Sequence, residues 1–200
     1  MNYEEQCDRV RAVLKAIPMD GSISVMTGRN GSGKSLVRKQ LSFKAKRANG
    51  TNVVHASMEL RTGIHSGLGG LGALLRDAEW SATSFSTVST IQTAMRSIHG
   101  GYLCPDEIEI GLGEETLAAL VNWLNGNLRE ALKGTLGCLV ITHNRGVVEN
   151  LSFDHWFSLD GYATPRDWLD RKIVPTDLEE LRKDDLGFFR FIEDNSEKKK

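Results

Sequence analysis

Residues 28–35 read Gly-Arg-Asn-Gly-Ser-Gly-Lys-Ser, a complete phosphate loop of the form G-x-x-x-x-G-K-[ST]. Glycine adopts backbone conformations that a Cβ would obstruct, so this string can turn its N–H groups inward around a phosphate chain. Lys34 adds a compact positive charge for the β- and γ-phosphates, and the Ser35 hydroxyl is a ligand for Mg²⁺. The residues expected to bind the nucleotide here are Arg29, Asn30, Gly31, Ser32, Gly33, Lys34 and Ser35.

The sequence on either side of the phosphate loop supports this interpretation. Residues 23–27 are expected to form a short strand before the loop, and residues 36–46 a helix after it. A helix N-terminus favours anions because its first backbone N–H groups have no partners within the helix. Several basic side chains on or just after this helix predict a solvated face, with a local basic patch as the alternative. They are Arg38, Lys39, Lys44, Lys46 and Arg47.

An acidic pair, Asp106-Glu107, follows a short apolar run at residues 102–104. In ATPases such a pair divides the chemistry, because the aspartate holds Mg²⁺ through water and the glutamate polarises the attacking water. An Asp-Glu pair at the end of a strand is often only a solvated turn. In a chain that also carries a phosphate loop, we interpret it as catalytic.

Composition and length describe an ordinary globular chain. Its 200 residues suit one α/β domain with a sizeable core, and 40% of them are hydrophobic. The net charge of −1 gives no overall field toward nucleic acid or membranes. We see no signal peptide and no long apolar run, and the separated cysteines Cys7, Cys104 and Cys138 suit a reducing compartment. We therefore expect a cytoplasmic protein.

Strand-like and helix-like segments alternate along the chain. Strands are expected near residues 22–27, 53–58, 102–104, 137–142 and 155–159, and helices near residues 3–17, 36–46, 88–98 and 114–132. This alternation predicts an α/β fold, a P-loop NTPase with a mostly parallel sheet covered by helices on both faces. We expect one domain over residues 1–200, with its core at 20–161, a C-terminal helical segment at 162–195 and a disordered tail at 196–200.

Three motifs, in chain order, resemble those of ATP-binding-cassette ATPases. The phosphate loop is similar to theirs, and residues 106–112, Asp-Glu-Ile-Glu-Ile-Gly-Leu, resemble their Asp-Glu-Pro-x-x-Gly-Leu string. Thr142-His143, at the end of an apolar run, resembles their switch histidine. The resemblance covers about residues 20–161. It implies ATP and Mg²⁺ as ligands and a helical insertion that is reduced here, because little chain separates the loop from the acidic pair.

The same resemblance assigns roles to individual residues. Asp106 would lie on the Mg²⁺ side together with Ser35, Glu107 would be the general base, and His143 would contact the γ-phosphate. It also implies a homodimer that closes on ATP, with composite sites at the interface. A γ-phosphate held by one chain still needs donors on its far side, and these would come from the second chain.

The chain departs from the family pattern in three places. Pro105 cannot donate to a central ladder, so the strand before the acidic pair must end or be distorted there. Gly113 replaces the aspartate expected after Gly-Leu, and there is no Leu-Ser-Gly-Gly-Gln signature. The nearest substitute is the hydroxyl-rich segment 84–87, expected just before the helix at 88–98. Ser86 could there bind the partner's γ-phosphate, although an ordinary N-cap explains the segment equally well.

The compact insertion argues against a transporter. The Glu-Ile-Gly-Leu spelling is nearer to ATPase heads of chromosome maintenance and repair, and to small phage or bacterial stand-alone forms. We therefore expect an ATPase that drives a conformational switch in such a process, with a nucleic acid or protein client left open. The alternatives are a small-molecule or nucleotide kinase, and a nucleotide-gated regulatory module that hydrolyses ATP slowly.

Overall fold

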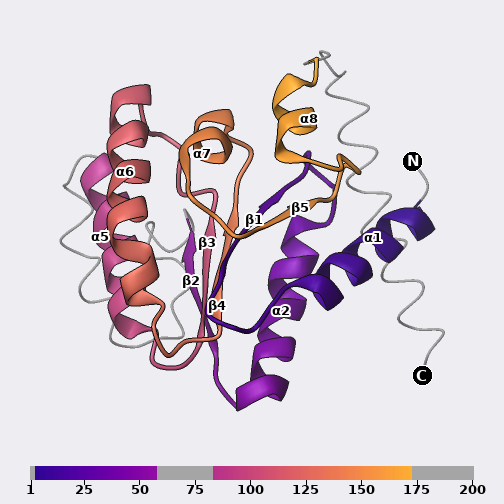
Figure 1. Ribbon diagram of the computed structural model, residues 1–200, viewed down its shortest axis with the longest axis horizontal. Helices are drawn as coiled ribbons and strands as arrows, with labels where there is room; N and C mark the ends of the chain where they lie inside the picture. Colours follow the sequence, from indigo (N-terminus) through magenta and orange to yellow (C-terminus); the bar gives the residue numbers. More distant parts are fainter. Residues whose placement is uncertain (1–2, 58–82, 173–200) are drawn as a thin grey trace.

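The computed structural model describes residues 3–57 and 83–172, in which strands and helices alternate (Figure 1). The strands are β1 (Ile23–Thr27), β2 (Val53–Ser57), β3 (Tyr102–Asp106), β4 (Gly137–Ile141) and β5 (His155–Ser158). The helices are α1 (Tyr3–Ala16), α2 (Lys34–Asn49), α5 (Thr83–Ser97), α6 (Glu114–Ala131), α7 (Arg145–Asn150) and α8 (Pro165–Asp170).

The described strands form a single sheet in the order β2-β3-β4-β1-β5. Every pairing in it is parallel, which confirms the predicted α/β architecture. Because β4 lies between β1 and β3, the strand that leads into the phosphate loop does not touch the strand that leads into the acidic pair. The end of β4 therefore lies midway between the two motifs.

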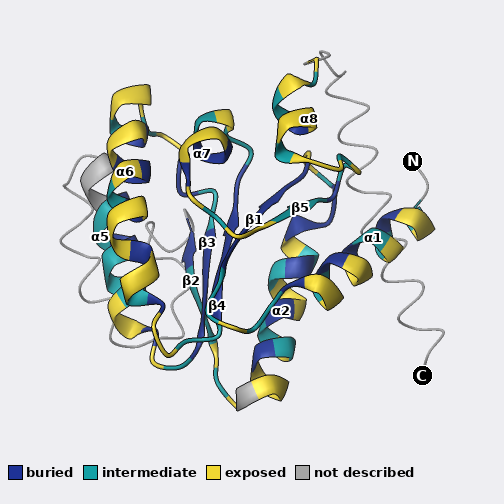
Figure 2. Cartoon of the chain, viewed as in Figure 1, coloured by how far each residue is buried: buried dark blue, intermediate teal, exposed yellow. Residues whose placement is uncertain are grey.

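Helices cover both faces of this sheet, and each face has its own core (Figures 1 and 2). Neighbouring residues of β1 show the alternation, since Val25 packs toward the α5 and α6 side while Met26 packs toward α1 and α2. All five residues of β1, and all five of β4, are buried. Such continuous burial is typical of central parallel strands, and it fixes the ends of these two strands rigidly.

Helix α6 matches its prediction closely. It spans nearly the predicted range, and its apolar side is buried against the sheet, with Leu124 fully enclosed and Leu120 only 2% exposed. The helix begins directly after Gly113 and carries Glu114 and Glu115 in its first turn, where acidic side chains complement the helix dipole.

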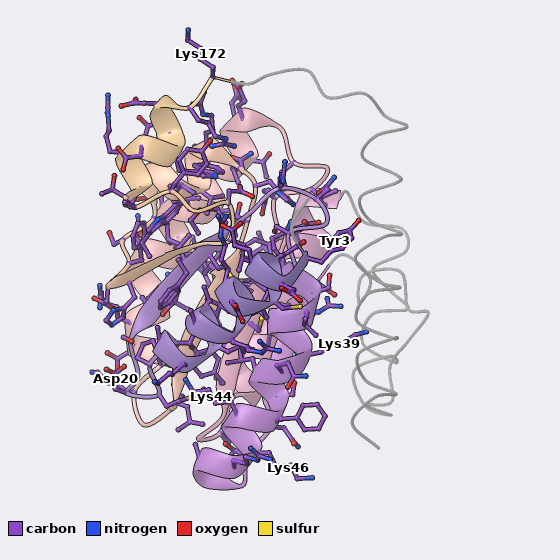
Figure 3. The ribbon with its side chains drawn as sticks, turned by 90° about the vertical axis from the view of Figure 1, so that its right-hand side faces the viewer. Tyr3, Asp20, Lys39, Lys44, Lys46 and Lys172 are labelled. Atoms are coloured by element: carbon purple, nitrogen blue, oxygen red, sulfur yellow. The ribbon has the colours of Figure 1, made fainter. Side chains whose placement is uncertain are left out.

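The basic face predicted for α2 is only partly solvated. Lys44 Nζ donates to the carbonyl of Leu14 at 2.7 Å and also to that of Ile17, so it caps the C-terminal end of α1. The prediction of a solvated side chain is therefore wrong for Lys44. On the side of α1 and α2 seen in Figure 3, the side chains of Lys39 and Lys46 point outward, as expected.

Helix α5 starts earlier than the sequence indicated. It begins at Thr83, so segment 84–87 lies inside the helix and not before it. Thr87 and Thr90 are buried, at 2% and 3% exposure, so part of the hydroxyl-rich run faces the core. Burial of one helix face outweighs the weak helix propensity of serine and threonine. The side chain of Ser86 lies outside the described part of the structure.

Pro105 distorts β3 without ending it. The strand continues to Asp106 and pairs with β2 through Pro105. On its other side it pairs with β4 at Tyr102, Leu103 and Asp106 only. Proline has no N–H to donate, and the pairing is interrupted only on the β4 side of the strand.

Some predicted segments fall outside the described residues. These are most of the C-terminal helical segment and the tail at 196–200, so the predicted domain extent and tail remain predictions. Within residues 3–57 and 83–172, none of the helices combines the length and the apolar character that crossing a membrane requires.

One half-buried histidine links β2 to α2 and gives a first test of the fold. His55 Nε2 lies 3.5 Å from Ser42 Oγ, and its Nδ1 is enclosed without a hydrogen-bond partner among the described residues. Burial, and to a smaller extent the charge of Arg38, lowers the pKa of His55 to about 4. The unfolded chain therefore takes up a proton first as the pH falls.

We predict that the free energy of unfolding falls between pH 7 and pH 5 by about 1–2 kcal/mol more in the wild type than in His55→Gln. The loss occurs in the window from about 6.5, the ordinary histidine pKa, down to about 4, the pKa in the folded state. Urea unfolding at the two pH values measures it. The exposed His99 offers a control, and a His55→Gln variant as pH-sensitive as His99→Gln would contradict the burial of this imidazole.

Candidate nucleotide-binding site

The phosphate loop connects the buried end of β1 to the first turn of α2. Gly31 and Gly33 have φ angles of 73° and 100°, which favour glycine. At Gly28 a Cβ would lie 2.3 Å from Ser32 Oγ, so a larger residue would not fit the present turn. The glycines of the motif are therefore required by the backbone path that the structure shows.

Two side chains from distant parts of the chain hold this loop. The backbone N–H of Arg29 donates to both carboxylate oxygens of Asp160, at 2.9 and 3.0 Å. The Gln6 side chain, from α1, is buried and donates through Nε2 to the carbonyl of Gly31. Sequence reasoning missed both anchors. Asp160 gave only a turn signal with Gly161, and Gln6 carried no signal beyond its place in a helix.

Lys34 lies within the loop. Its side chain is only 10% exposed, and Nζ donates to the carbonyls of Gly28 at 3.0 Å and Arg29 at 3.2 Å. The next residue, Ser35, is exposed at the start of α2. Arg29 and Asn30 are also exposed, so of the predicted phosphate-binding residues these two lie at the outer rim.

The loop residues fit a magnesium–nucleotide complex. The Ser32 hydroxyl is enclosed and has no hydrogen-bond partner among the described residues, which is costly unless a ligand uses it. Mg²⁺ prefers one or two protein oxygens together with phosphates and water, and Ser35 with Asp106 would supply such oxygens. The described residues hold no cluster of three or more metal-ligating side chains, so the chain shows no all-protein metal cage there.

Strand register brings the three predicted motifs to one edge of the sheet. Met26 of β1 and Asp106 of β3 both align with Ile141 of β4. The carboxyl ends of parallel strands are where α/β proteins bind ligands. The residues one or two positions further on, Glu107 and His143, therefore meet in front of the phosphate loop.

Glu107 occupies the centre of this arrangement. Its Oε1 lies 4.0 Å from Lys34 Nζ and 2.6 Å from His143 Nε2. Its backbone N–H donates to the Ile141 carbonyl at 2.9 Å, which ties it to the end of β4. Glu107 has a φ of 51°, the one positive φ outside glycine in the described residues. Backbone strain of this kind gathers at functional sites, where the surroundings impose it.

His143 is half-buried beside Glu107. Burial is the main cause that lowers its pKa, the nearby Lys34 lowers it further, and the Glu107 carboxylate offsets these effects only in part. The lowered pKa favours the neutral imidazole at pH 7. Nε2 lies 2.6 Å from the Glu107 carboxylate oxygen, which is ion-pair distance when the imidazole is protonated.

Asp106 makes a contact that the sequence did not predict. Arg38 Nη1 lies 2.8 Å from Asp106 Oδ2, and the two side chains are 20% and 16% exposed. The expectation that Arg38 belongs to a solvated face is therefore wrong. Burial raises the pKa of Asp106, and the guanidinium counters this in part. The spacing in the sequence could have indicated this contact, since Arg38 follows Lys34 by one helical turn and shares its face of α2.

Glu109 is a second acidic residue that sequence reasoning left without a role. It is 9% exposed, and its Oε1 accepts hydrogen bonds from the Thr142 hydroxyl and, at 3.1 Å, from the His143 backbone N–H. Burial raises the pKa of Glu109, and these two hydrogen bonds act against the increase. Glu109 belongs to the Glu-Ile-Gly-Leu string, but nothing in that string indicates its contact with the turn after β4.

A parallel sheet with a glycine-rich phosphate loop between β1 and α2 identifies the fold. The chain has a P-loop NTPase fold. No protein-family model matches the sequence, and no curated protein matches it either. Among solved structures, this chain is similar to the Pif1 helicase from Candida albicans, with a TM-score of 0.40 and 16% sequence identity. The match covers 77% of this chain and 39% of the helicase chain. A similarity this weak supports no statement about activity.

We predict that the Arg38–Asp106 pair contributes measurably to stability. Arg38→Gln leaves the half-buried Asp106 carboxylate without its nearest counter-charge and should lower the free energy of unfolding by about 1–3 kcal/mol, less than for a fully buried pair. In a double-mutant cycle with Asp106→Asn, the coupling energy should be about 0.5–3 kcal/mol. Urea unfolding measures all four proteins. Arg47→Gln, an exposed arginine on the same helix, is the control, and additive effects of the two substitutions would refute the pairing.

Proposed function

We propose that this chain is an ATPase that binds Mg-ATP at the phosphate loop and uses Glu107 as its general base. The observation that carries the proposal is the convergence of Lys34, Glu107 and His143 from three separate strand ends. Lys34 Nζ and His143 Nε2 lie 4.0 Å and 2.6 Å from the same oxygen, Oε1 of Glu107. Chance turns at three strand ends would not bring these three groups to one point.

Each residue then has a defined task. The Glu107 carboxylate would take a proton from an attacking water, which is what general-base catalysis requires. Lys34 lies where it can balance phosphate charge, and to do so it exchanges its loop carbonyls for phosphate oxygens. Neutral His143 can donate one hydrogen bond without adding a charge to the site.

Mg²⁺ would bind next to Ser35 and Asp106. When bound, the ion neutralises charge on the phosphates. The Asp106 carboxylate already receives Arg38, so it would serve the ion and the guanidinium together. In the proposed site, the aspartate on the Mg²⁺ side is therefore also one half of an ion pair.

The resemblance to ATP-binding-cassette ATPases extends the proposal to a dimer. The far side of the site would be completed by a second copy of the chain, with the start of α5 and Ser86 as the contributing segment. Such a dimer would open after hydrolysis and switch a client in DNA maintenance or repair, or in a phage or bacterial process. A kinase would need an acceptor substrate, and a regulatory module would bind ATP with little turnover, so a turnover assay separates them.

The phosphate loop can be tested by binding alone. We predict that Lys34→Ala weakens binding of ATP with Mg²⁺ by at least about 30-fold, because a desolvated charge pair is lost. Isothermal titration calorimetry measures it. Lys39→Ala, an exposed lysine on the same helix, should bind as the wild type does. Wild-type protein that is folded and gives no heat with ATP or GTP would refute the whole proposal.

The general base can be tested by turnover. Glu107→Gln keeps the shape of the side chain but cannot accept the proton, so ATP hydrolysis should fall about 10²- to 10⁴-fold while ATP binding persists. A phosphate-release assay measures it, with the exposed Glu149→Gln of α7 as control. The same Glu107→Gln protein with ATP should run as a dimer in light scattering, and a monomer there would remove the dimer from the proposal.

A further inference from the structure

Glu109 joins the two loops that carry the proposed catalytic groups. It lies two residues after Glu107, in the turn that leaves β3, while both of its hydrogen-bond donors lie in the turn that leaves β4. The donors are the Thr142 side chain and the backbone N–H of His143 itself. Oε1 of Glu109 therefore links the turn that carries Glu107 to the turn that carries His143.

The contact continues into the next helix. The Thr142 hydroxyl also accepts from the backbone N–H of Asn144 at 2.9 Å. Asn144 in turn caps α7, because its Oδ1 accepts from the N–H groups of Gly146 at 2.7 Å and Val147 at 3.3 Å. The turn that holds His143 is thus fixed at one end by Glu109 and at the other by the start of a packed helix.

Burying the Glu109 carboxylate at this position costs folding free energy. Glu109 is almost fully buried, its Oε2 has no hydrogen-bond partner among the described residues, and the carboxylate of Glu107 lies on the same turn. An apolar side chain of this size could fill the same space, but it would leave the Thr142 hydroxyl and the His143 N–H without this acceptor. The position of the His143 turn therefore depends on Oε1.

We propose that Glu109 is a positioning residue that sets His143 against Glu107. It acts by accepting the His143 backbone N–H, which fixes where the imidazole meets the carboxylate of the general base. The catalytic consequence rests on the ATPase function proposed above, whereas the effect on His143 does not. Without this acceptor the His143 turn can move, and a displacement of about 1 Å at a catalytic site can cost up to about 100-fold in rate.

The test compares two substitutions that differ in their acceptor. Glu109→Met fills a similar volume without a good acceptor, and Glu109→Gln restores a carbonyl oxygen in the place of Oε1. Glu115→Gln, an exposed carboxylate in the first turn of α6, is the matched control. Hydrogen exchange of the His143 amide, followed by NMR in protein without nucleotide, reports the contact directly. Steady-state hydrolysis and ATP calorimetry report its consequence.

In Glu109→Met we expect His143 amide protection to fall by about tenfold or more, the loss of one hydrogen bond to a charged group. We also expect kcat to fall on the order of 10- to 100-fold with ATP affinity within about twofold of wild type. Glu109→Gln should restore both. Unchanged His143 exchange in Glu109→Met, or lowered kcat in Glu109→Gln with normal exchange, would overturn the proposal.

Two further outcomes are separable. If the wild type binds ATP but does not hydrolyse it, the ATPase proposal fails, and the exchange of the His143 amide still decides whether Glu109 positions this turn. If Glu109→Met does not fold, Glu109→Asp replaces it, since this variant keeps a carboxylate but draws it back from the His143 N–H by one methylene. Unchanged His143 exchange and kcat in Glu109→Asp would then overturn the proposal.

Discussion

The site depends on the alignment of three strand ends. Met26, Ile141 and Asp106 share one level of the sheet, and the pairings that set this level lie in strands whose side chains are mostly buried. A slip of one residue in any of these strands would exchange the side chains that fill the two cores, so core packing enforces the register. The distance between Lys34 and Glu107 is therefore set by packing far from either residue.

Charge balance is the second constraint on this edge of the sheet. Lys34 and Arg38 extend from one face of α2 toward Glu107 and Asp106, so each half-buried charge has an opposite charge within reach. Buried charges without partners are costly, and the four groups satisfy one another. A triphosphate would add several negative charges to a neutral cluster. The loop amides, the exposed Ser35 and a divalent ion are what the chain offers to balance them.

For the residues that belong to motifs, their place at this edge of the sheet could be predicted from the sequence. The phosphate loop, the acidic pair and His143 could be placed because each directly follows an apolar run that had to be a buried strand, and parallel strands end at one edge. Single residues such as Arg38, Asp160 and Glu109 could not be placed, since their roles come from contacts between segments far apart in the chain. The start of α5 was also missed, because burial of Thr87 and Thr90 overrode local propensity.

These unpredicted residues have a common effect on the site. Gln6 and Asp160 hold the phosphate loop through backbone atoms, and Glu109 holds the His143 turn in the same way. A loop whose backbone is fixed from outside does not need to be ordered by its ligand, so less binding energy is lost to ordering. The same anchors make the site sensitive to α1, to the end of β5 and to α7. A partner that shifts any of these elements would thus change the phosphate loop or the His143 turn without touching the nucleotide.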